Sequence, residues 1–406
     1  MTTESTSVQT EPLTASYRIV IDALDWGPSV VTTVLALSEP IRVEDICSFT
    51  VTETGAYGQE NVREVTDIYL CDEAGIRTDG DSAYLAIEMR PIPCGAGSYF
   101  VFSMETYRNE VNEDYSLSFV TDADPGDPLY QLDVQGISSG TDIPDIELFE
   151  TDVFAMEDLA LNYGLYRPVT EGSHPLIIWL HGQGEGGDDV RVALLGNRVT
   201  AFAESEVQDA MNGAYVLIPQ CPTYWPEAEA GNGTFGTSPD GSSAYLSILK
   251  GLIDQTIVDH PDIDPNRILI GGCSMGGYMT TSMLLAYPDF FAAGFPVCAY
   301  YPSTLIDDDE LTTLSSTPLW YINCESDQTV PVKTNSGAII DRLQEIGVEV
   351  HSSSFPYVAD LTGKYFDENG DPFFYNPHWV WIHVYNGDCN EGSLTLWDFL
   401  ADARLS

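Results

Sequence analysis

The sequence predicts two parts, an all-β sandwich followed by an α/β domain in which helices cover both faces of a mostly parallel sheet. Three observations support this prediction. Short strand-like segments without a helical period occupy the chain up to about residue 121, and residues 122–140 are rich in Asp, Gly, Pro and Ser. After about residue 141, buried apolar runs alternate with helical stretches. A chain of 406 residues, 44% of them hydrophobic, can bury two cores.

The first part contains short segments that are rich in β-branched and aromatic residues and are separated by turns. They occupy residues 17–24, 30–37, 48–52, 65–70, 83–89, 99–104 and 115–120. About seven such strands with no clear helix are typical of an immunoglobulin-like sandwich. We therefore place a polar tail at 1–14, the sandwich at 15–125 and a linker at 126–144.

The second part, residues 145–406, reads as a parallel sheet because its strands are continuous apolar runs. These runs cover residues 175–180, 214–218, 267–271, 293–298, 319–323 and 348–351. Helical stretches are expected from about 245 to 257, 334 to 346 and 394 to 403. In such sheets the active site lies at the carboxyl ends of the strands.

The charge balance is strongly acidic, with 63 Asp and Glu against 15 Lys and Arg and a formal net charge of −48. Such a surface disfavours nucleic acid and anionic membranes as partners. This negative charge is explained equally well by adaptation to high salt and by the solubility that an excess of carboxylates gives. No apolar run approaches the roughly 20 residues that cross a bilayer. The polar start has no signal-peptide pattern, and we expect an extracellular or cell-surface protein whose leader lies outside this sequence.

The eight cysteines show no metal-binding spacing, and no metal or organic cofactor is expected. Three of them fall in the first third of the chain and five in the rest, so neither part can pair its cysteines completely. Some free thiols are therefore expected.

The strongest motif is Gly-Cys-Ser-Met-Gly at residues 272–276, directly after an expected strand and before a helix that stops at Pro288. A turn this tight requires glycines, and it exposes the Ser274 hydroxyl at a helix start, where N–H groups stabilise an anion. A glycine-rich turn in an ordinary strand–helix unit is the alternative. The strand–turn–helix setting favours a nucleophilic serine.

A nucleophilic serine needs a carboxylate and a histidine, which follow it in the order Ser, Asp or Glu, His. Asp327 comes after the strand at 319–323 and is preferred over Glu325 two residues earlier. Only His378 and His383 follow the last expected strand, and His378 is preferred. The other histidines lie before or within strands, at a helix end, or in another motif.

A glycine-rich loop at residues 182–187 follows His181 and the strand at 175–180. Such a loop leaves backbone N–H groups free, and we expect an oxyanion hole built from the N–H groups of Gln183 and Met275. A phosphate-binding loop is excluded because no Gly-Lys-Ser/Thr follows.

With these motifs the chain resembles bacterial esterases that carry an N-terminal immunoglobulin-like domain, related to polyhydroxybutyrate-depolymerase-like and feruloyl-esterase-like α/β-hydrolases. The matching stretches run in the same order along most of the second part, at residues 161–168, 180–187, 218–225, 264–268, 272–278, 326–331 and 378–381.

The resemblance implies a triad of Ser274, Asp327 and His378, the oxyanion hole named above, and a Trp225 that borders the acyl pocket. The sequence departs from the family at Gly186, where a basic residue is common, and at Pro377, where glycine is more usual. These departures put in doubt the shape of the loops around the pocket.

The expected function is a serine carboxylic-ester hydrolase that forms an acyl-enzyme. Its expected substrates are short-chain or compact aromatic acyl esters, with feruloyl and polyester substrates in that range. Tyr224, Trp225 and Phe235, in the long segment 222–238, would form an apolar wall for the acyl group. Residues before about 130 are expected to donate no catalytic group. The alternatives are a peptidase of the prolyl-oligopeptidase type, a binding module without catalysis, and a first domain that binds carbohydrate. The oligomeric state is open.

Overall fold

The computed structural model describes residues 12–230 and 241–405, which divide into two compact units. The first unit contains the chain up to Asp22, Pro28–Val101 and Val111–Pro144. The second contains Asp145 onward together with two short segments from the first third of the sequence, Ala23–Gly27 and Phe102–Glu110. These two segments bear on the site described below.

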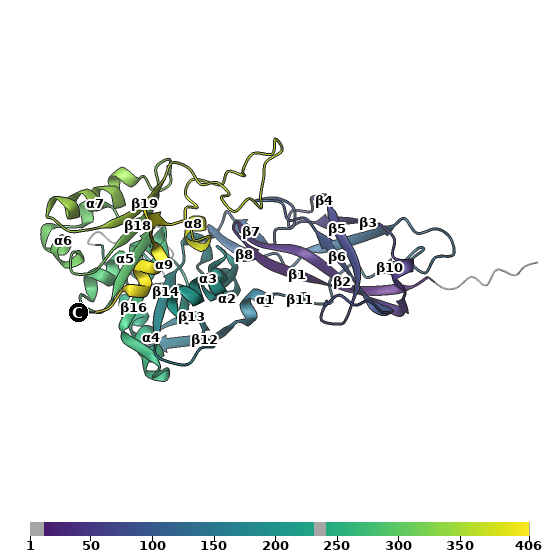
Figure 1. Cartoon of the computed structure of the whole chain (residues 1–406), viewed down its shortest axis with the longest axis horizontal. Helices are drawn as coiled ribbons and strands as arrows, with labels where there is room; N and C mark the ends of the chain where they lie inside the picture. The colour runs from purple at the N-terminus through teal and green to yellow at the C-terminus, as the bar shows by residue number, and fades with distance from the viewer. Residues whose placement is uncertain (1–11, 231–240, 406) are drawn as a thin grey trace, which may run out of the picture. The chain divides into compact units, whose positions relative to one another are not determined.

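The first unit is built mostly of antiparallel strands in two main sheets, with the order β10-β1-β2-β6-β5 and β4-β3-β9 (Figure 1). The short strands β10 and β11 pair with β1 in parallel. The strands are β1 (Thr14–Leu24), β2 (Gly27–Ile41), β3 (Phe49–Thr54), β4 (Glu60–Arg63), β5 (Val65–Cys71), β6 (Ser82–Met89), β9 (Ser116–Thr121) and β10 (Asp133–Val134); β11 (Thr141–Asp142) also pairs with β1. A separate pair, β7 (Phe100–Ser103) and β8 (Arg108–Val111), falls largely within the segment Phe102–Glu110 of the second unit. Burial alternates along β1, where Tyr17, Ile19 and Ile21 point into the core. The predicted immunoglobulin-like sandwich is confirmed.

The second unit is organised around an eight-stranded sheet with the order β12-β13-β15-β14-β16-β17-β18-β19. Its strands are β12 (Phe149–Met156), β13 (Leu159–Tyr166), β14 (His174–Leu180), β15 (Tyr215–Gln220), β16 (Ile263–Cys273), β17 (Ala293–Val297), β18 (Trp320–Cys324) and β19 (His351–Phe355). The first two pairings along this order, β12 with β13 and β13 with β15, are antiparallel, and all later pairings are parallel. The predicted α/β-hydrolase architecture is confirmed.

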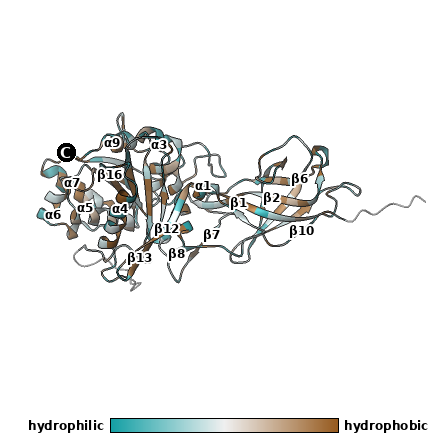
Figure 2. Cartoon of the chain, turned by 90° about the horizontal axis from the view of Figure 1, so that it is seen from below, coloured by the Kyte–Doolittle hydropathy of each residue, from teal (hydrophilic) through white to brown (hydrophobic). Residues whose placement is uncertain are grey.

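Helices cover both faces of this sheet because successive side chains of its central strands point to opposite sides. In β14, Leu176 and Ile178 pack with α4 (Leu246–Asp259), α5 (Met275–Ala286), α6 (Asp308–Leu314) and α7 (Ser336–Glu345). Ile177 and Trp179 of the same strand pack with α2 (Val190–Leu195), α3 (Ser205–Met211), α8 (Trp381–Tyr385) and α9 (Leu396–Asp402). The apolar residues of the central strands are brown in Figure 2.

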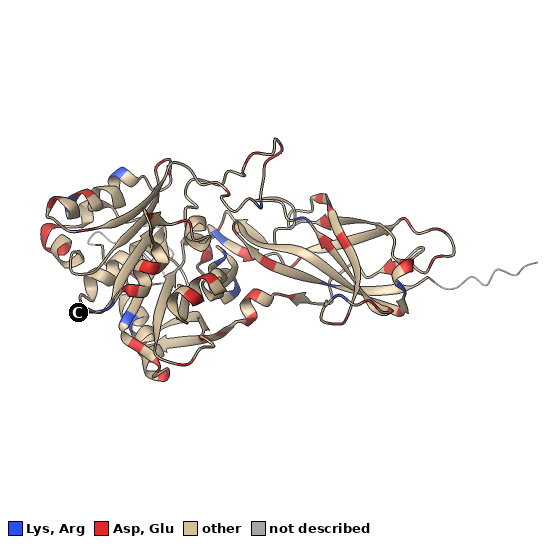
Figure 3. Cartoon of the chain, in the orientation of Figure 1, with Lys and Arg blue, Asp and Glu red and all other residues tan. Residues whose placement is uncertain are grey.

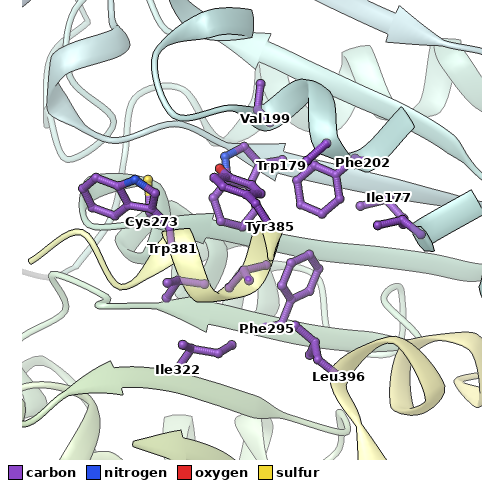
Figure 4. Packing of buried hydrophobic residues seen from close by; sticks show 14 of the residues in the cluster. Ile177, Trp179, Val199, Phe202, Cys273, Phe295, Ile322, Trp381, Tyr385 and Leu396 are labelled. Carbon is purple, nitrogen blue, oxygen red and sulfur yellow. The ribbon is translucent and has the colours of Figure 1, made fainter. Parts of the chain in front are cut away.

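Aromatic rings fill the layer between the sheet and the helices near the C-terminus. Trp179 lies 5.3 Å from Phe202 and 5.4 Å from Tyr385 between ring centroids, and Figure 4 shows these side chains grouped beside the yellow α8. Cys273, the residue before Ser274, belongs to the same cluster. The end of β16 therefore rests on a tightly packed base.

The two edge strands are where the structure differs from the sequence prediction. The expected strand at 348–351 is instead β19 (His351–Phe355), and the hairpin of β12 and β13 had no predicted counterpart. An edge strand has only one neighbour in the sheet and exposes much of its surface, so it lacks a continuous apolar run. Val350 is buried just before β19, which explains the shifted prediction.

Acidic side chains are spread over helices, strands and loops in both units, while basic ones are few (Figure 3). All eight cysteines are free thiols. In the part of the chain that the structure describes, no helix is long and apolar enough to cross a membrane.

Candidate active site

Ser274 lies in the sharp turn between β16 and α5 with a strained backbone, φ 56° and ψ −113°. The flanking glycines permit this turn. A Cβ on Gly272 would lie 2.5 Å from the carbonyl oxygen of Leu180, and a Cβ on Gly276 would lie 1.9 Å from the same oxygen. Both distances are shorter than atoms can approach, so the turn requires glycine at these two positions.

Three backbone hydrogen bonds hold the strained serine in place. The Ser274 N–H donates to the carbonyl of Val297 at 2.9 Å, which ties the turn to β17. The Ser274 carbonyl accepts from the N–H groups of Tyr278 at 3.1 Å and Tyr300 at 2.9 Å. The surrounding structure thus offsets the cost of the unusual backbone and leaves the side chain free to face His378.

The structure brings Ser274, His378 and Asp327 together. The Ser274 Oγ lies 3.0 Å from His378 Nε2, and His378 Nδ1 lies 2.7 Å from Asp327 Oδ2. An ionised carboxylate only accepts, so Nδ1 carries the proton and Nε2 accepts from the serine hydroxyl. The three residues form one hydrogen-bonded chain from a buried carboxylate to a partly exposed hydroxyl.

Asp327 is fixed by its position after β18, and only 2% of it is exposed. Its Oδ1 accepts from the N–H groups of Thr329 at 2.8 Å and Val330 at 3.0 Å, so Oδ2 is left for the histidine. The rival Glu325 is exposed, and its carboxylate accepts only from Ser354 Oγ at 3.3 Å among the contacts of the described chain. Glu325 does not reach His378.

The rival His383 forms a similar pair elsewhere. Its Nδ1 lies 2.8 Å from Asp388 Oδ2, and its ring stacks on Phe355 with 4.0 Å between centroids. It is 1% exposed on α8, and its Nε2 has no hydrogen-bond partner among the described residues. In the described part of the chain, no serine hydroxyl is hydrogen-bonded to this second pair.

The two backbone N–H groups expected to form an oxyanion hole both lie at the start of a helical turn. Met275 begins α5, so its N–H lacks the partner that a helix interior would supply. Gln183 begins the short helical turn η2 (Gln183–Glu185) after the Leu180 end of β14. Within residues 12–230 and 241–405, neither N–H donates a hydrogen bond. The structure thus keeps both expected donors available.

His181 holds the peptide group that carries the Gln183 N–H. Its Nε2 accepts from the Cys221 N–H at 2.9 Å, so its Nδ1 carries a proton and donates to the Gly182 carbonyl at 2.6 Å. Burial lowers the pKa of His181 to about 4, which keeps the ring neutral near pH 7. Because a trans peptide is planar with its C=O and N–H opposed, fixing the Gly182 carbonyl fixes the direction of the Gln183 N–H.

Trp225 requires a correction. It is 0% exposed, its ring lies 5.2 Å from the His181 ring, and its indole N–H donates to the His181 carbonyl at 3.1 Å. The structure therefore places Trp225 in the core beneath the loop instead of on a pocket wall. Tyr224 is also buried, and Phe235 of the expected wall lies outside the described residues.

The two departures from the family pattern fit their surroundings. A Cβ on Gly186 would lie 2.4 Å from the carbonyl oxygen of Thr223, so no larger residue fits without moving the backbone. Pro377 lies inside a turn in which the His378 N–H donates to Asn376 Oδ1 at 3.0 Å. That turn sets the start of the histidine loop.

The segment Ala23–Gly27 contributes a buried network that sequence reasoning missed. Asp25, 3% exposed, lies 3.2 Å from the Arg198 guanidinium and accepts from Asn386 at 3.2 Å and Tyr375 at 3.4 Å. Tyr375 precedes His378 by three residues, so this network anchors the histidine loop. Spacing along the chain gives no signal for it, because Asp25 and Tyr375 are 350 positions apart.

Family models match both parts of the chain. Residues 169–358 match the model described as "Phospholipase/Carboxylesterase", and residues 16–125 match the one described as "Esterase Ig-like N-terminal domain". Within the described residues, no group of three or more His, Cys, Asp or Glu is arranged to hold a metal ion.

Two relatives illustrate the likeness. The solved structure named "Crystal Structure of a Thermostable Esterase" is similar over 96% of this chain and 99% of its own, with a TM-score of 0.72 and 24% identity, a likeness of fold. Poly(3-hydroxyalkanoate) depolymerase C of Paucimonas lemoignei is 35% identical over 81 residues, 18% of this chain. The matched stretch spans 19% of that protein's length.

Proposed function

Because residues 169–358 belong to the phospholipase/carboxylesterase family of α/β-hydrolases and residues 16–125 are an esterase Ig-like domain, we propose that the protein is a serine carboxylesterase. Its nucleophile is Ser274, its base His378 and its orienting carboxylate Asp327. The observation that carries the proposal is the hydrogen-bonded chain of 3.0 Å and 2.7 Å through these three side chains.

The geometry supports an acyl-enzyme mechanism. As Ser274 Oγ attacks the ester carbonyl, its proton passes to His378 Nε2, and Asp327 stabilises the imidazolium through the Nδ1 proton. The histidine then protonates the leaving alcohol, which departs as the acyl-enzyme forms. Water, deprotonated by the same histidine, releases the acid and restores the serine.

The oxyanion that forms on the substrate carbonyl is held by the N–H groups of Gln183 and Met275. They come from two separate turns, one after β14 and one at the start of α5, and both are free of other partners in the described chain. A donor of this kind typically lowers the activation barrier by about 3 to 4 kcal/mol.

For the substrate we propose esters with a short or compact aromatic acyl group, soluble or part of a polyester. The strongly acidic composition disfavours anionic substrates. Cleaving an amide also requires protonation of a poor leaving amine. Peptidases in addition use contacts that position the peptide chain. Arg108, which lies against the 221–225 segment, is already occupied by the Pro222 carbonyl at 2.9 Å and the Tyr224 ring at 5.0 Å.

The test compares kcat/KM for acetyl, butyryl and feruloyl esters with matched anilides, beside a polyhydroxyalkanoate suspension. We expect ester turnover to exceed anilide turnover at least about a hundredfold, because the leaving amine needs protonation. Equal turnover of esters and anilides would replace the esterase with a peptidase of the prolyl-oligopeptidase type, which uses the same three residues. No turnover of any ester would overturn the proposal.

A further inference from the structure

Four consecutive residues of the segment Phe102–Glu110, which belongs to the second unit, contact the loops around the proposed oxyanion hole. The Thr106 carbonyl accepts from the Tyr224 hydroxyl at 2.7 Å, and the Tyr107 carbonyl accepts from Gln183 Nε2 at 3.3 Å. Arg108 donates to the Pro222 carbonyl at 2.9 Å, and Asn109 Nδ2 donates to Glu185 Oε1 at 3.2 Å. Each of these contacts ends on the glycine-rich loop or on the loop after β15.

Glu185 has no role in the mechanism above, yet it is a carboxylate buried to 6% exposure two residues after Gln183. The side-chain amide of Asn197 and the backbone N–H groups of Gly182 and Glu185 also lie near this carboxylate. Among the described residues, none with a positive charge forms an ion pair with it. Burial raises the pKa of Glu185 to about 7, and the four donors act in the opposite direction.

Glycines make room for this arrangement. A Cβ on Gly196 would lie 2.5 Å from Glu185 Cγ, and a Cβ on Gly184 would lie 3.0 Å from Asn109 Nδ2. A Cβ on Gly182 would lie 3.2 Å from Glu185 Oε2. The glycines of the loop therefore serve the approach of Asn109 and Glu185, besides leaving room for a substrate.

Gly182 is held at both of its backbone groups. Its N–H faces the Glu185 carboxylate, and its carbonyl accepts from His181 Nδ1 at 2.6 Å. The next N–H along the chain is that of Gln183, which has no partner in the described residues. Rotation of the Gly182–Gln183 peptide away from the substrate would break the carbonyl contact. The Glu185 carboxylate meets the N–H of the preceding peptide and so holds the other side of Gly182.

We propose that Asn109 and Glu185 are positioning residues for the oxyanion hole: the carboxylate, held by the Asn109 amide, holds Gly182 through the peptide that precedes the Gln183 N–H, and so limits the movement of the donor that stabilises the oxyanion. The proposal rests on the function proposed above. It also gives a segment from the first third of the sequence a part in turnover, although that segment donates no catalytic group.

The experiment measures kcat, KM and the melting temperature of the full chain on p-nitrophenyl acetate. Asn109→Ala should lower kcat about tenfold, and Glu185→Gln, which leaves one acceptor oxygen, on the order of a hundredfold. KM should change less than about threefold in both, because the lost interaction forms in the transition state. In the double variant the losses should be less than multiplicative, because both act through one contact.

The first unit offers a matched control. Asn61 Nδ2 donates to Glu53 Oε1 at 3.0 Å, and Glu53 is 3% exposed, so this pair repeats the contact away from the site. Asn61→Ala should lower the melting temperature as Asn109→Ala does and leave kcat unchanged. Gly184→Ala, which pushes Asn109 away from the loop, should copy Asn109→Ala.

Wild-type kcat in folded Asn109→Ala and Glu185→Gln would overturn the inference, as would an equal loss in Asn61→Ala. If Glu185→Gln does not fold, Asn109→Ala, at a half-buried position, decides alone. A wild-type protein that cleaves no ester would instead remove the proposed function, and the two failures are thereby distinguished.

Discussion

The segment from residue 376 to residue 388 holds two histidines, each paired with an aspartate in nearly identical geometry. The Nδ1–Oδ2 distance is 2.7 Å in the pair of His378 and Asp327 and 2.8 Å in the pair of His383 and Asp388. They differ at the other ring nitrogen, which meets Ser274 Oγ in the first pair and no described partner in the second. In the proposed mechanism, a histidine oriented by a carboxylate is therefore not enough. Its second ring nitrogen must also face a nucleophile, and N–H donors must lie near that nucleophile.

Removing the nucleophile is the strongest test of this difference. Ser274→Ala should lower kcat on the order of 10⁶-fold, because the triad acts as a unit. The partly exposed hydroxyl contributes little to folding, so the melting temperature should stay close to that of the wild type. The measurement is p-nitrophenyl acetate hydrolysis by purified protein, freed of contaminating esterase. If Ser274→Ala retained turnover, Ser274 would not be the nucleophile, and the pair of His378 and Asp327 would have no catalytic role.

Replacing each of the two histidines by alanine tests the comparison directly. His378→Ala should lower kcat about as far as Ser274→Ala, on the order of 10⁵- to 10⁶-fold, since it removes the base. His383→Ala should keep kcat within about tenfold and instead cost about 2 to 4 kcal/mol of stability, because it opens a cavity beside Phe355. His383→Asn provides a milder variant if the alanine does not fold. The reverse ranking would move the catalytic base to α8.

Replacing the aspartates of the two pairs should show the same contrast in kcat, with a smaller loss than for the histidines. Asp327→Asn should lower kcat about 10⁴-fold, because an amide favours the wrong tautomer of His378. Asp388→Asn should change kcat less than about threefold. Comparable losses in both variants, measured with the same soluble ester at pH 7.5, would show that the two pairs are coupled.

Sequence reasoning predicted the residues whose position follows from topology. Ser274, Asp327 and His378 each follow a strand, and parallel strands bring their carboxyl ends to one edge of the sheet. It could not predict Trp225 correctly, since nothing local distinguishes a tryptophan under a loop from one beside a pocket. Asn109 and Asp25 were beyond its reach, because their partners lie 76 and more than 170 positions away.

The edge strands mark the corresponding limit for the fold. β14 and β16 are buried on both faces, and their apolar runs predicted them well. β12 exposes most of its residues, and β19 has the sequence His-Ser-Ser-Ser-Phe. Strand pairing there is decided by the neighbouring strand, which no local pattern encodes.

A third buried histidine, His181, has no carboxylate partner among the described residues. Its effect is expected in the pH dependence of stability. Burial lowers its pKa to about 4 from an ordinary 6.5, so the unfolded chain binds the extra proton and stability falls as pH drops from 6.5 to 4. Glu185 acts in the opposite sense. Its pKa of about 7, against an ordinary 4.5, makes the folded chain hold the proton, so stability falls as pH rises from 4.5 to 7.

Between pH 4.5 and 6.5 these two contributions oppose each other, each of about 3 kcal/mol over its full range. Glu185→Gln removes only the second. The unfolding free energy of wild type minus that of Glu185→Gln should therefore fall by about 3 kcal/mol as pH rises from 4.5 to 7. Urea titrations at four pH values across this range measure the difference, with Glu53→Gln as the control for loss of a buried carboxylate that has a cation, Arg63, 3.1 Å away. A difference that stays flat with pH would contradict the raised pKa of Glu185 and would mean that its hydrogen-bond donors outweigh its burial.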